Sequence, residues 1–181
     1  RSLYALPDEF LEMNLLRLPG KNLMNKLQHA ALTLYNYDED NRLILKYGTI
    51  EFLTTMHYIE KYVKPGARIL EIGAGTGRYS HALARQGYTV DAVELVEHNI
   101  DIFKKNTQPD ENITIIQGNA LDLSAFSDNQ YDITLLLGPL YHLYTTTDKQ
   151  QALSEAIRVT KSSGIIFAAY VISDGCLLDE G

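Results

Sequence analysis

The chain has 181 residues, of which 45% are apolar and 22% are charged, as expected for one globular domain with a short extension rather than a disordered tail. With 16 basic and 23 acidic residues the formal net charge is −7, which disfavours a nucleic-acid partner because nucleic-acid-binding surfaces are basic. Cys176 is the single cysteine, so disulfide frameworks and cysteine-rich zinc sites within one chain are excluded.

The sequence gives no sign of membrane insertion or secretion. The longest apolar run, residues 165–172, has the length of a strand, far from the roughly 20 residues of a membrane helix. Residues 1–4 lack the basic region and apolar stretch of a secretory signal. We therefore expect a cytoplasmic protein without a membrane partner, and the histidine spacing predicts no metal site.

Residues 1–64 are expected to form an N-terminal helical extension or cap. Apolar spacing predicts a short helix over residues 25–34, and residues 1–23 are interpreted as either a non-native or a flexible segment. A second helix is expected from Thr49 until Pro65 and Gly66 end it. It leads into the main domain, residues 65–181.

Strands and helices alternate through the main domain, which predicts a doubly wound α/β fold with a mostly parallel sheet covered by helices on both faces. The expected strands are residues 67–72, 88–95, 112–117, 131–137 and 165–172. A capping box of Thr147 and Gln150 predicts the start of the last helix. The run 162–164, Ser-Ser-Gly, is expected to end that helix.

The segment Leu70–Gly77 joins the end of the first strand to a helix and carries three glycines at alternate positions. Glycine lets the backbone approach a ligand closely. A dinucleotide loop would place a sixth-position glycine where this chain has Arg78, which argues against a nicotinamide oxidoreductase. With Glu71 two residues before the first glycine, the segment resembles motif I of the class I S-adenosylmethionine-dependent methyltransferases.

This resemblance extends over residues 64–172 and implies a Rossmann-like sheet of order 3-2-1-4-5. It implies S-adenosylmethionine as cofactor, with Glu94 at the end of the second strand accepting bonds from the ribose hydroxyls. Asn119 would accept a bond from the adenine amino group, where the family commonly has aspartate. Glu71 would face the methionyl ammonium, the alternative being buried structural pairing. The cofactor-binding residues implied are Glu71, Gly73, Ala74, Gly75, Thr76, Gly77, Glu94, Leu95, Asn119, Ala120, Leu137 and Gly138.

The loop after the fourth strand carries Tyr141 and His142 where the resemblance places the methyl acceptor. An imidazole that titrates near neutral pH is a candidate general base. The alternative is that both residues cap the next helix or line the pocket. The segment from Gly138 to Tyr141 departs from the Asp/Asn-Pro-Pro-Tyr motif of enzymes that methylate amino groups of DNA and RNA.

The predicted function is methyl transfer to a small-molecule acceptor. A non-catalytic S-adenosylmethionine-binding module and a protein methyltransferase are the alternatives. The family usually adds two further strands beyond the fifth, which are absent from this chain. We expect the core to be incomplete at its C-terminus, with the fifth strand covered by a missing segment or by a second copy in a homo-oligomer.

Overall fold

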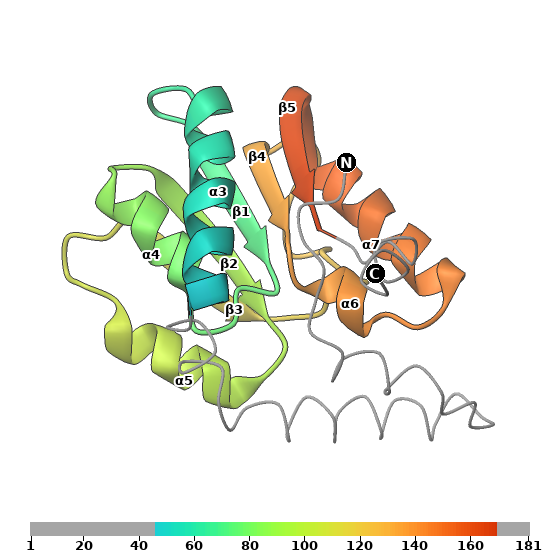
Figure 1. The fold of residues 1–181 in the computed structure, drawn as a ribbon. Helices are drawn as coiled ribbons and strands as arrows, with labels where there is room; N and C mark the ends of the chain where they lie inside the picture. The colour runs from blue at the N-terminus through green and yellow to red at the C-terminus, as the bar shows by residue number, and fades with distance from the viewer. Residues whose placement is uncertain (1–45, 170–181) are drawn as a thin grey trace, which may run out of the picture.

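The computed structural model describes residues 46–169, which form one five-stranded sheet flanked by helices (Figure 1). The strands are β1 (Arg68–Ile72), β2 (Thr89–Glu94), β3 (Ile113–Gln117), β4 (Tyr131–Leu136) and β5 (Thr160–Ala168). The helices are α3 (Lys46–Tyr62), α4 (Arg78–Arg85), α5 (Glu97–Asn106), α6 (Pro139–His142) and α7 (Thr146–Val159). The helix expected over residues 25–34, the segment 1–23 and Cys176 lie outside the described residues.

All neighbouring strands are parallel, in the order β3-β2-β1-β4-β5. The predicted order 3-2-1-4-5 is therefore confirmed, as is a helix before β1. Parallel strands that join through helices bring all their carboxyl ends to one edge of the sheet. The loops that leave this edge carry the predicted site residues.

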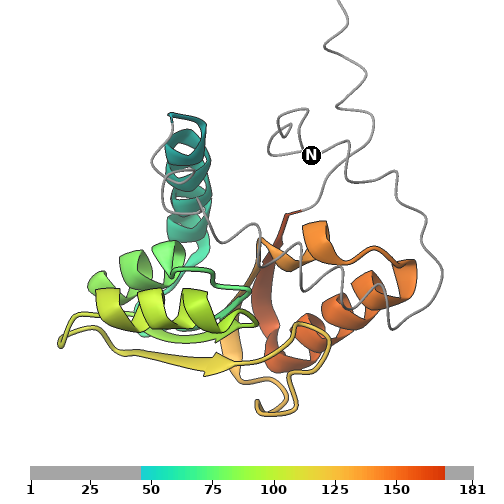
Figure 2. The same cartoon turned by 90° about the horizontal axis from the view of Figure 1, so that it is seen from below.

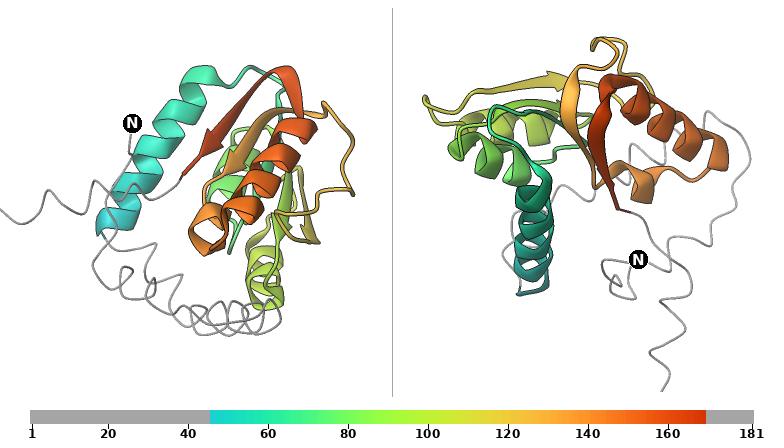
Figure 3. Two further views of the ribbon diagram at one scale, coloured as in Figure 1. Left: turned by 90° about the vertical axis from the view of Figure 1, so that its right-hand side faces the viewer. Right: turned by 90° about the horizontal axis from the view of Figure 1, so that it is seen from above.

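Helices lie on both faces of the sheet (Figures 2 and 3), and the strands β1, β2 and β4 are buried on two sides. On one face, Ile59 of α3 and Leu83 of α4 pack with Ile69 of β1. On the other face, Ala156 of α7 packs with Leu70, the next residue of β1. Successive residues of β1 thus enter opposite layers, which explains why its apolar residues are consecutive instead of alternating with exposed polar ones.

The last strand begins earlier than the sequence predicts. β5 starts at Thr160, directly after α7, and the Ser-Ser-Gly run lies inside the strand. The pairing with β4 shifts from Tyr131↔Thr160 to Ile133↔Ile165, so the strand takes up the polar residues as an irregularity. Thr160 fixes this start because its hydroxyl donates to the Ala156 carbonyl at 2.6 Å. The helix end expected at residues 162–164 is wrong, and β5 ends at Ala168.

The N-terminus of α7 also differs from expectation. Thr145 is the N-cap, and its Oγ1 accepts from the Asp148 amide at 3.0 Å. Thr147 is already inside the helix and exposed, so the predicted capping box is wrong. Among the described helices, none is both long and apolar enough to cross a membrane. Residues 46–169 also contain no group of three His, Cys, Asp or Glu side chains that could hold a metal ion.

Candidate functional site

Backbone hydrogen bonds join three of the carboxyl ends of the strands. The amides of Gly73 and Ala74 both donate to the Val93 carbonyl, at 2.8 and 3.0 Å. The Gly118 amide donates to the Glu94 carbonyl at 3.0 Å. The loops after β1, β2 and β3 therefore meet at one place, and the predicted positions in them are brought together.

The glycine loop between β1 and α4 needs a left-handed backbone at three positions. Gly73, Gly75 and Gly77 have φ of 73°, 56° and 92°, a region that strains other residues. A Cβ on Gly75 would have no atom within 4 Å, whereas a Cβ on Gly73 would lie 2.7 Å from Pro139 Cγ. The loop therefore packs on α6 at its start and faces open space at its centre.

Glu94 is buried at the end of β2, with 6% of the residue exposed. Its Oε2 accepts from the Gly75 amide at 2.8 Å, and its Oε1 accepts from the Val96 amide at 2.9 Å and from Asn99 Nδ2 at 3.4 Å. A carboxylate offers about four acceptor positions. Glu94 thus holds the glycine loop and keeps capacity for a further donor, with Asn99 as its weakest partner.

Glu71 lies inside the protein behind the glycine loop, with 3% of the residue exposed. The amide and the hydroxyl of Ser80, in the first turn of α4, both donate to its Oε2. Burial raises the pKa of Glu71 from its ordinary 4.5 to about 8, although the bonds from Ser80 act in the opposite direction. The structural pairing considered for Glu71 is present, and its partner is Ser80.

The loop after β3 presents Asn119 and Ala120 beside the end of β2. Asn119 is exposed, and its Oδ1 accepts from the Leu121 amide at 3.0 Å, which leaves one lone pair for another donor. Ala120 is buried in the core. Leu95 follows Glu94 and is 39% exposed, so it offers an apolar surface near this turn.

The segment after β4 reaches the glycine loop from the other half of the sheet. Leu137 and Gly138 are half-buried and lead into α6, a four-residue helix that the sequence analysis did not predict. Tyr141 and His142 occupy the end of α6 and are also half-buried. The packing of Pro139 on Gly73 holds this helix against the loop.

The first turn of α4 contains contacts that sequence reasoning missed. The guanidinium carbon of Arg78 lies 4.4 Å from the ring centroid of Phe52 in α3. The ring centroid of Tyr79 lies 5.1 Å from that of the same phenylalanine. Thr55 hydrogen-bonds to the Tyr79 hydroxyl, and burial raises the pKa of this phenol. The helix before β1 is therefore attached to the start of α4, immediately after the glycine loop.

His81 completes the same turn on the side of α5. Its Nδ1 is 2.7 Å from Glu111 Oε2, and its ring lies 4.5 Å from that of Phe103. Glu111 also accepts from Arg85 Nε at 2.7 Å. His81 is buried, and no local sequence pattern predicts its pairing with Glu111, 30 residues away.

The glycine loop and most of the sheet fall within a match to one protein family. The family model described as a methyltransferase domain matches residues 70–168, more than half of the chain. This chain belongs to the class I S-adenosylmethionine-dependent methyltransferases. The prediction from the glycine loop is confirmed at the level of the family and its cofactor.

Individual relatives of this chain belong to the same family. Demethylmenaquinone methyltransferase of Lysinibacillus sphaericus is 31% identical over 136 residues, covering 72% of this chain and 55% of the relative. The enzyme of the same name from Clavibacter sepedonicus is 32% identical over 102 residues, covering 56% and 40%. A crystal structure of an S-adenosylmethionine-dependent methyltransferase from Methanosarcina mazei has 25% identity and a TM-score of 0.52, covering 57% of this chain and 52% of that chain. The chain spans about half the length of these relatives.

The glycine loop of this chain suits a cofactor without phosphate groups. The amides of Gly73, Ala74, Gly75 and Gly77 already donate to Val93, Glu94 and Ala74. A phosphate-binding loop presents such amides to the anion. Here they are used within the protein, so they are not presented to an anion. The residues present therefore fit S-adenosylmethionine, which has hydroxyl and amino donors for Glu94 and Asn119 and no phosphate group.

Proposed function

We propose that this protein transfers a methyl group from S-adenosylmethionine to a small-molecule acceptor. The observation that carries the proposal is the glycine loop whose amides are used internally, next to a buried carboxylate at the end of β2. Such a loop accommodates a ligand by close approach and by acceptor groups for hydroxyls, as a nucleoside with a neutral or cationic tail requires.

The proposed roles follow the strand ends. Glu94 accepts bonds from the ribose hydroxyls, and Asn119 Oδ1 accepts from the adenine amino group. Leu95 and Ala120 supply apolar contact for the adenine, while Leu137 and Gly138 lie under the adenosyl and methionine parts. Glu71 and the glycine loop, including Thr76, lie on the side of the methionyl ammonium.

When bound, the cofactor supplies a methyl group activated by a positively charged sulfur. The protein then has to hold an acceptor in line with that group, and positioning supplies much of the acceleration. We propose that α6 does this, with His142 removing the acceptor proton and Tyr141 orienting the acceptor. Demethylmenaquinone, which the names of the relatives give as their substrate, is the first acceptor to assay.

Calorimetry tests the cofactor site. We expect micromolar binding of S-adenosylhomocysteine and a loss of about 10- to 150-fold in affinity for Glu94→Ala, the range for a hydrogen bond to a charged group. Glu97→Ala, which removes an exposed carboxylate three residues later, is the control and should bind as the parent does. Equal affinities for the two variants, or tight binding of NAD, would contradict the proposal.

Turnover separates the enzyme from a non-catalytic binding module. His142→Ala should keep its affinity for S-adenosylhomocysteine and should lower methyl transfer by roughly 100-fold if proton removal is required. His98→Ala, on the exposed side of α5, is the matched control. Methyl transfer at the parental rate by the His142 variant would return this residue to a structural role, and an absence of turnover with every acceptor would favour the binding module.

A further inference from the structure

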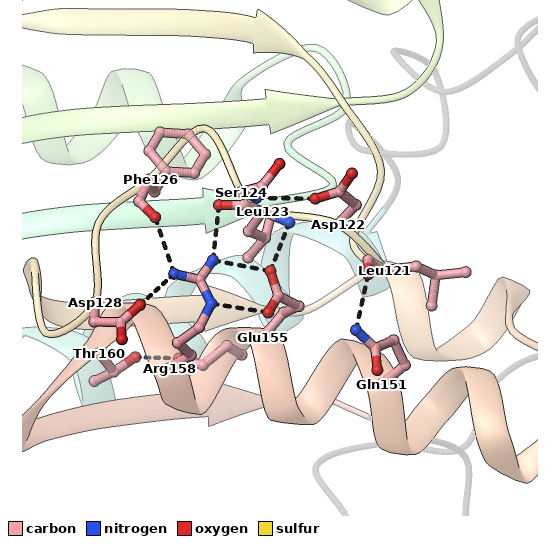
Figure 4. Close-up of polar contacts among 11 residues, drawn as sticks. Leu121, Asp122, Leu123, Ser124, Phe126, Asp128, Gln151, Glu155, Arg158 and Thr160 are labelled. Atoms are coloured by element: carbon pink, nitrogen blue, oxygen red, sulfur yellow. Dashed lines mark hydrogen bonds and ion pairs between the residues drawn. The ribbon is translucent and has the colours of Figure 1, made fainter.

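Three side chains on one face of α7 hold the loop that follows β3 (Figure 4). Gln151, Glu155 and Arg158 recur at the spacing i, i+4 and i+7 of a helix face. We call them the loop clamp. They bind the loop in the order in which the two segments run, first at Leu121, then at Leu123, and then at Phe126 and Asp128.

Arg158 has a partner for every N–H group of its guanidinium. Nε and Nη2 donate to the two oxygens of Glu155 at 2.8 and 2.9 Å, and the second N–H of Nη2 donates to the Leu123 carbonyl at 2.8 Å. Nη1 donates to the Phe126 carbonyl at 3.0 Å and to Asp128 Oδ1 at 2.6 Å. Lysine cannot reproduce this planar, five-donor arrangement.

Leu123 is the residue that the loop clamp fixes most completely. Its carbonyl accepts from Arg158, and its amide donates to Glu155 Oε2 at 2.7 Å. Its side chain is 1% exposed and shares a core cluster with Ala120. The backbone of Leu123 is therefore held on both sides by α7.

The clamped residues adjoin the turn that carries Asn119. The Asn119 carbonyl accepts from the Asp122 amide at 3.0 Å, while its side chain accepts from the Leu121 amide. Gln151 Nε2 donates to the Leu121 carbonyl at 3.1 Å. Residues 121–123 thus connect the turn at Asn119 to α7. Leu121 and Leu123 bond to α7 directly, and Asp122 lies between them.

We propose that the loop clamp positions Asn119 and Ala120 for recognition of the adenine ring, so that Arg158 is a positioning residue for cofactor selectivity. This inference rests on the proposed function. The loop extends from Gly118 to Gln130 without a helix or strand of its own, and a loop of this kind is held in place only by its contacts. The selectivity of the turn for adenine therefore depends on a helix that lies outside the proposed cofactor contacts.

The first test measures the loop itself. In Arg158→Lys we expect amide hydrogen exchange at Leu121, Asp122 and Leu123 to become at least tenfold faster without cofactor. Arg85→Lys is the matched control, because it makes the same change in a part-buried ion pair, with Glu111, that joins the end of α4 to the residue before Asn112 and not to the clamped loop. Its exchange at residues 121–123 should equal that of the parent.

The second test measures selectivity, with S-adenosylhomocysteine and its 6-oxo analogue S-inosylhomocysteine as ligands. The analogue replaces the amino donor by an oxygen, which Asn119 Oδ1 cannot accept from. We expect Arg158→Lys to lower the affinity for S-adenosylhomocysteine about tenfold, or about 1.4 kcal/mol, and to affect the analogue less. The ratio of the two affinities then becomes smaller, whereas a change of stability away from the loop, as in Arg85→Lys, affects both ligands equally.

Gln151→Ala provides a milder variant, since it removes one exposed side chain and its single bond to Leu121. It should narrow the preference about twofold to threefold and decides the question if Arg158→Lys does not fold. If the clamp variants that fold keep the parental ratio of affinities for S-adenosylhomocysteine and S-inosylhomocysteine, the inference is wrong, even if their hydrogen exchange is faster. A parent protein that binds neither ligand contradicts the proposed function instead, and unchanged exchange at residues 121–123 then overturns the clamp independently.

Discussion

Glu71 gives the protein a pH dependence whose sign follows from its burial. Because the folded state raises the pKa of Glu71 from 4.5 to about 8, the folded protein holds this proton more tightly than the unfolded chain does between these values. The contribution of Glu71 to stability is therefore fully present below about pH 4.5, and it is lost as the pH rises towards 8.

The variant Glu71→Gln checks this sign, since glutamine imitates the neutral carboxyl group. Urea unfolding without cofactor should show that the parent loses more free energy of unfolding between pH 5 and pH 8 than Glu71→Gln does, at up to about 1.4 kcal/mol per pH unit. The same pH dependence in both proteins would mean that Glu71 ionises normally in the folded state.

Gly77 combines backbone strain with a lack of space, and Gly87 separates the two effects. Both have φ near 90°, at 92° and 89°. A Cβ on Gly77 would lie 2.6 Å from Phe103 Cε2 and 2.8 Å from His81 Cδ2, whereas a Cβ on Gly87 would meet nothing within 4 Å. Gly87→Ala should cost about 1–2 kcal/mol of backbone strain. Gly77→Ala should cost about 1–3 kcal/mol more.

Thermal and urea unfolding of these two variants provide the measurement. Equal losses of stability would show that α5 moves away to make room for a methyl group at residue 77. A larger loss for Gly77→Ala, accompanied by weaker cofactor binding, would show that the contact with Phe103 sets the position of the glycine loop.

The candidate site residues that could be predicted from the sequence are those that occupy a recognisable place in a local pattern. The glycines of residues 73–77 and Glu94 stand at the ends of apolar runs, and such local patterns are visible without a structure. The partners of Glu71, His81 and Arg158 are set by tertiary packing of distant segments. A charged residue on a helix is usually solvated, so no local signal distinguishes Arg158 from an exposed charged residue of α7 such as Lys149.

At the scale of elements, α7 permits a comparison between the predicted and the observed cap. Thr145→Ala removes the hydroxyl that accepts from the Asp148 amide and should cost about 1 kcal/mol. Thr147→Ala, inside the helix, should be neutral or slightly stabilising because alanine has the higher helix propensity. Chemical denaturation of both variants measures the difference, and the reverse order would place the helix start at Thr147.

The junction of α7 and β5 shows why element boundaries were harder to predict than elements. A Ser-Ser-Gly run usually separates elements, but here Thr160 begins the strand and the extra residues bulge beside β4. α6 was missed because four residues are too few for a helical period to show. Both differences arise where tertiary contacts override a local preference.

At the scale of the molecule, the sheet order was predicted from the resemblance, because alternating strands and helices alone permit several orders. The same order leaves β5 at one edge, paired with β4 among the described residues. Ile165, Ile166 and Phe167 are only half-buried there. An apolar edge strand tends to pair with another strand.

We therefore expect the 181-residue chain to associate through β5, despite a net charge of −7 that opposes association. Light scattering coupled to size exclusion measures this directly. A stable monomer of 20.4 kDa at millimolar concentration, without aggregation, would show that the edge is tolerated. Dimers that dissociate when Ile166 is replaced by lysine would identify the edge as the interface.

The contact between Gly73 and Pro139 has a consequence for how such a protein can diversify. It joins the loop proposed to hold the cofactor directly to the helix proposed to face the acceptor, without intervening strands. The position of Tyr141 and His142 is therefore tied to the backbone of the glycine loop as well as to β4. Residues beyond Pro139 can then change with the acceptor while the geometry of transfer is inherited unchanged. The packing of Pro139 on Gly73 thus keeps the cofactor loop and the start of α6 together while the acceptor-binding residues vary.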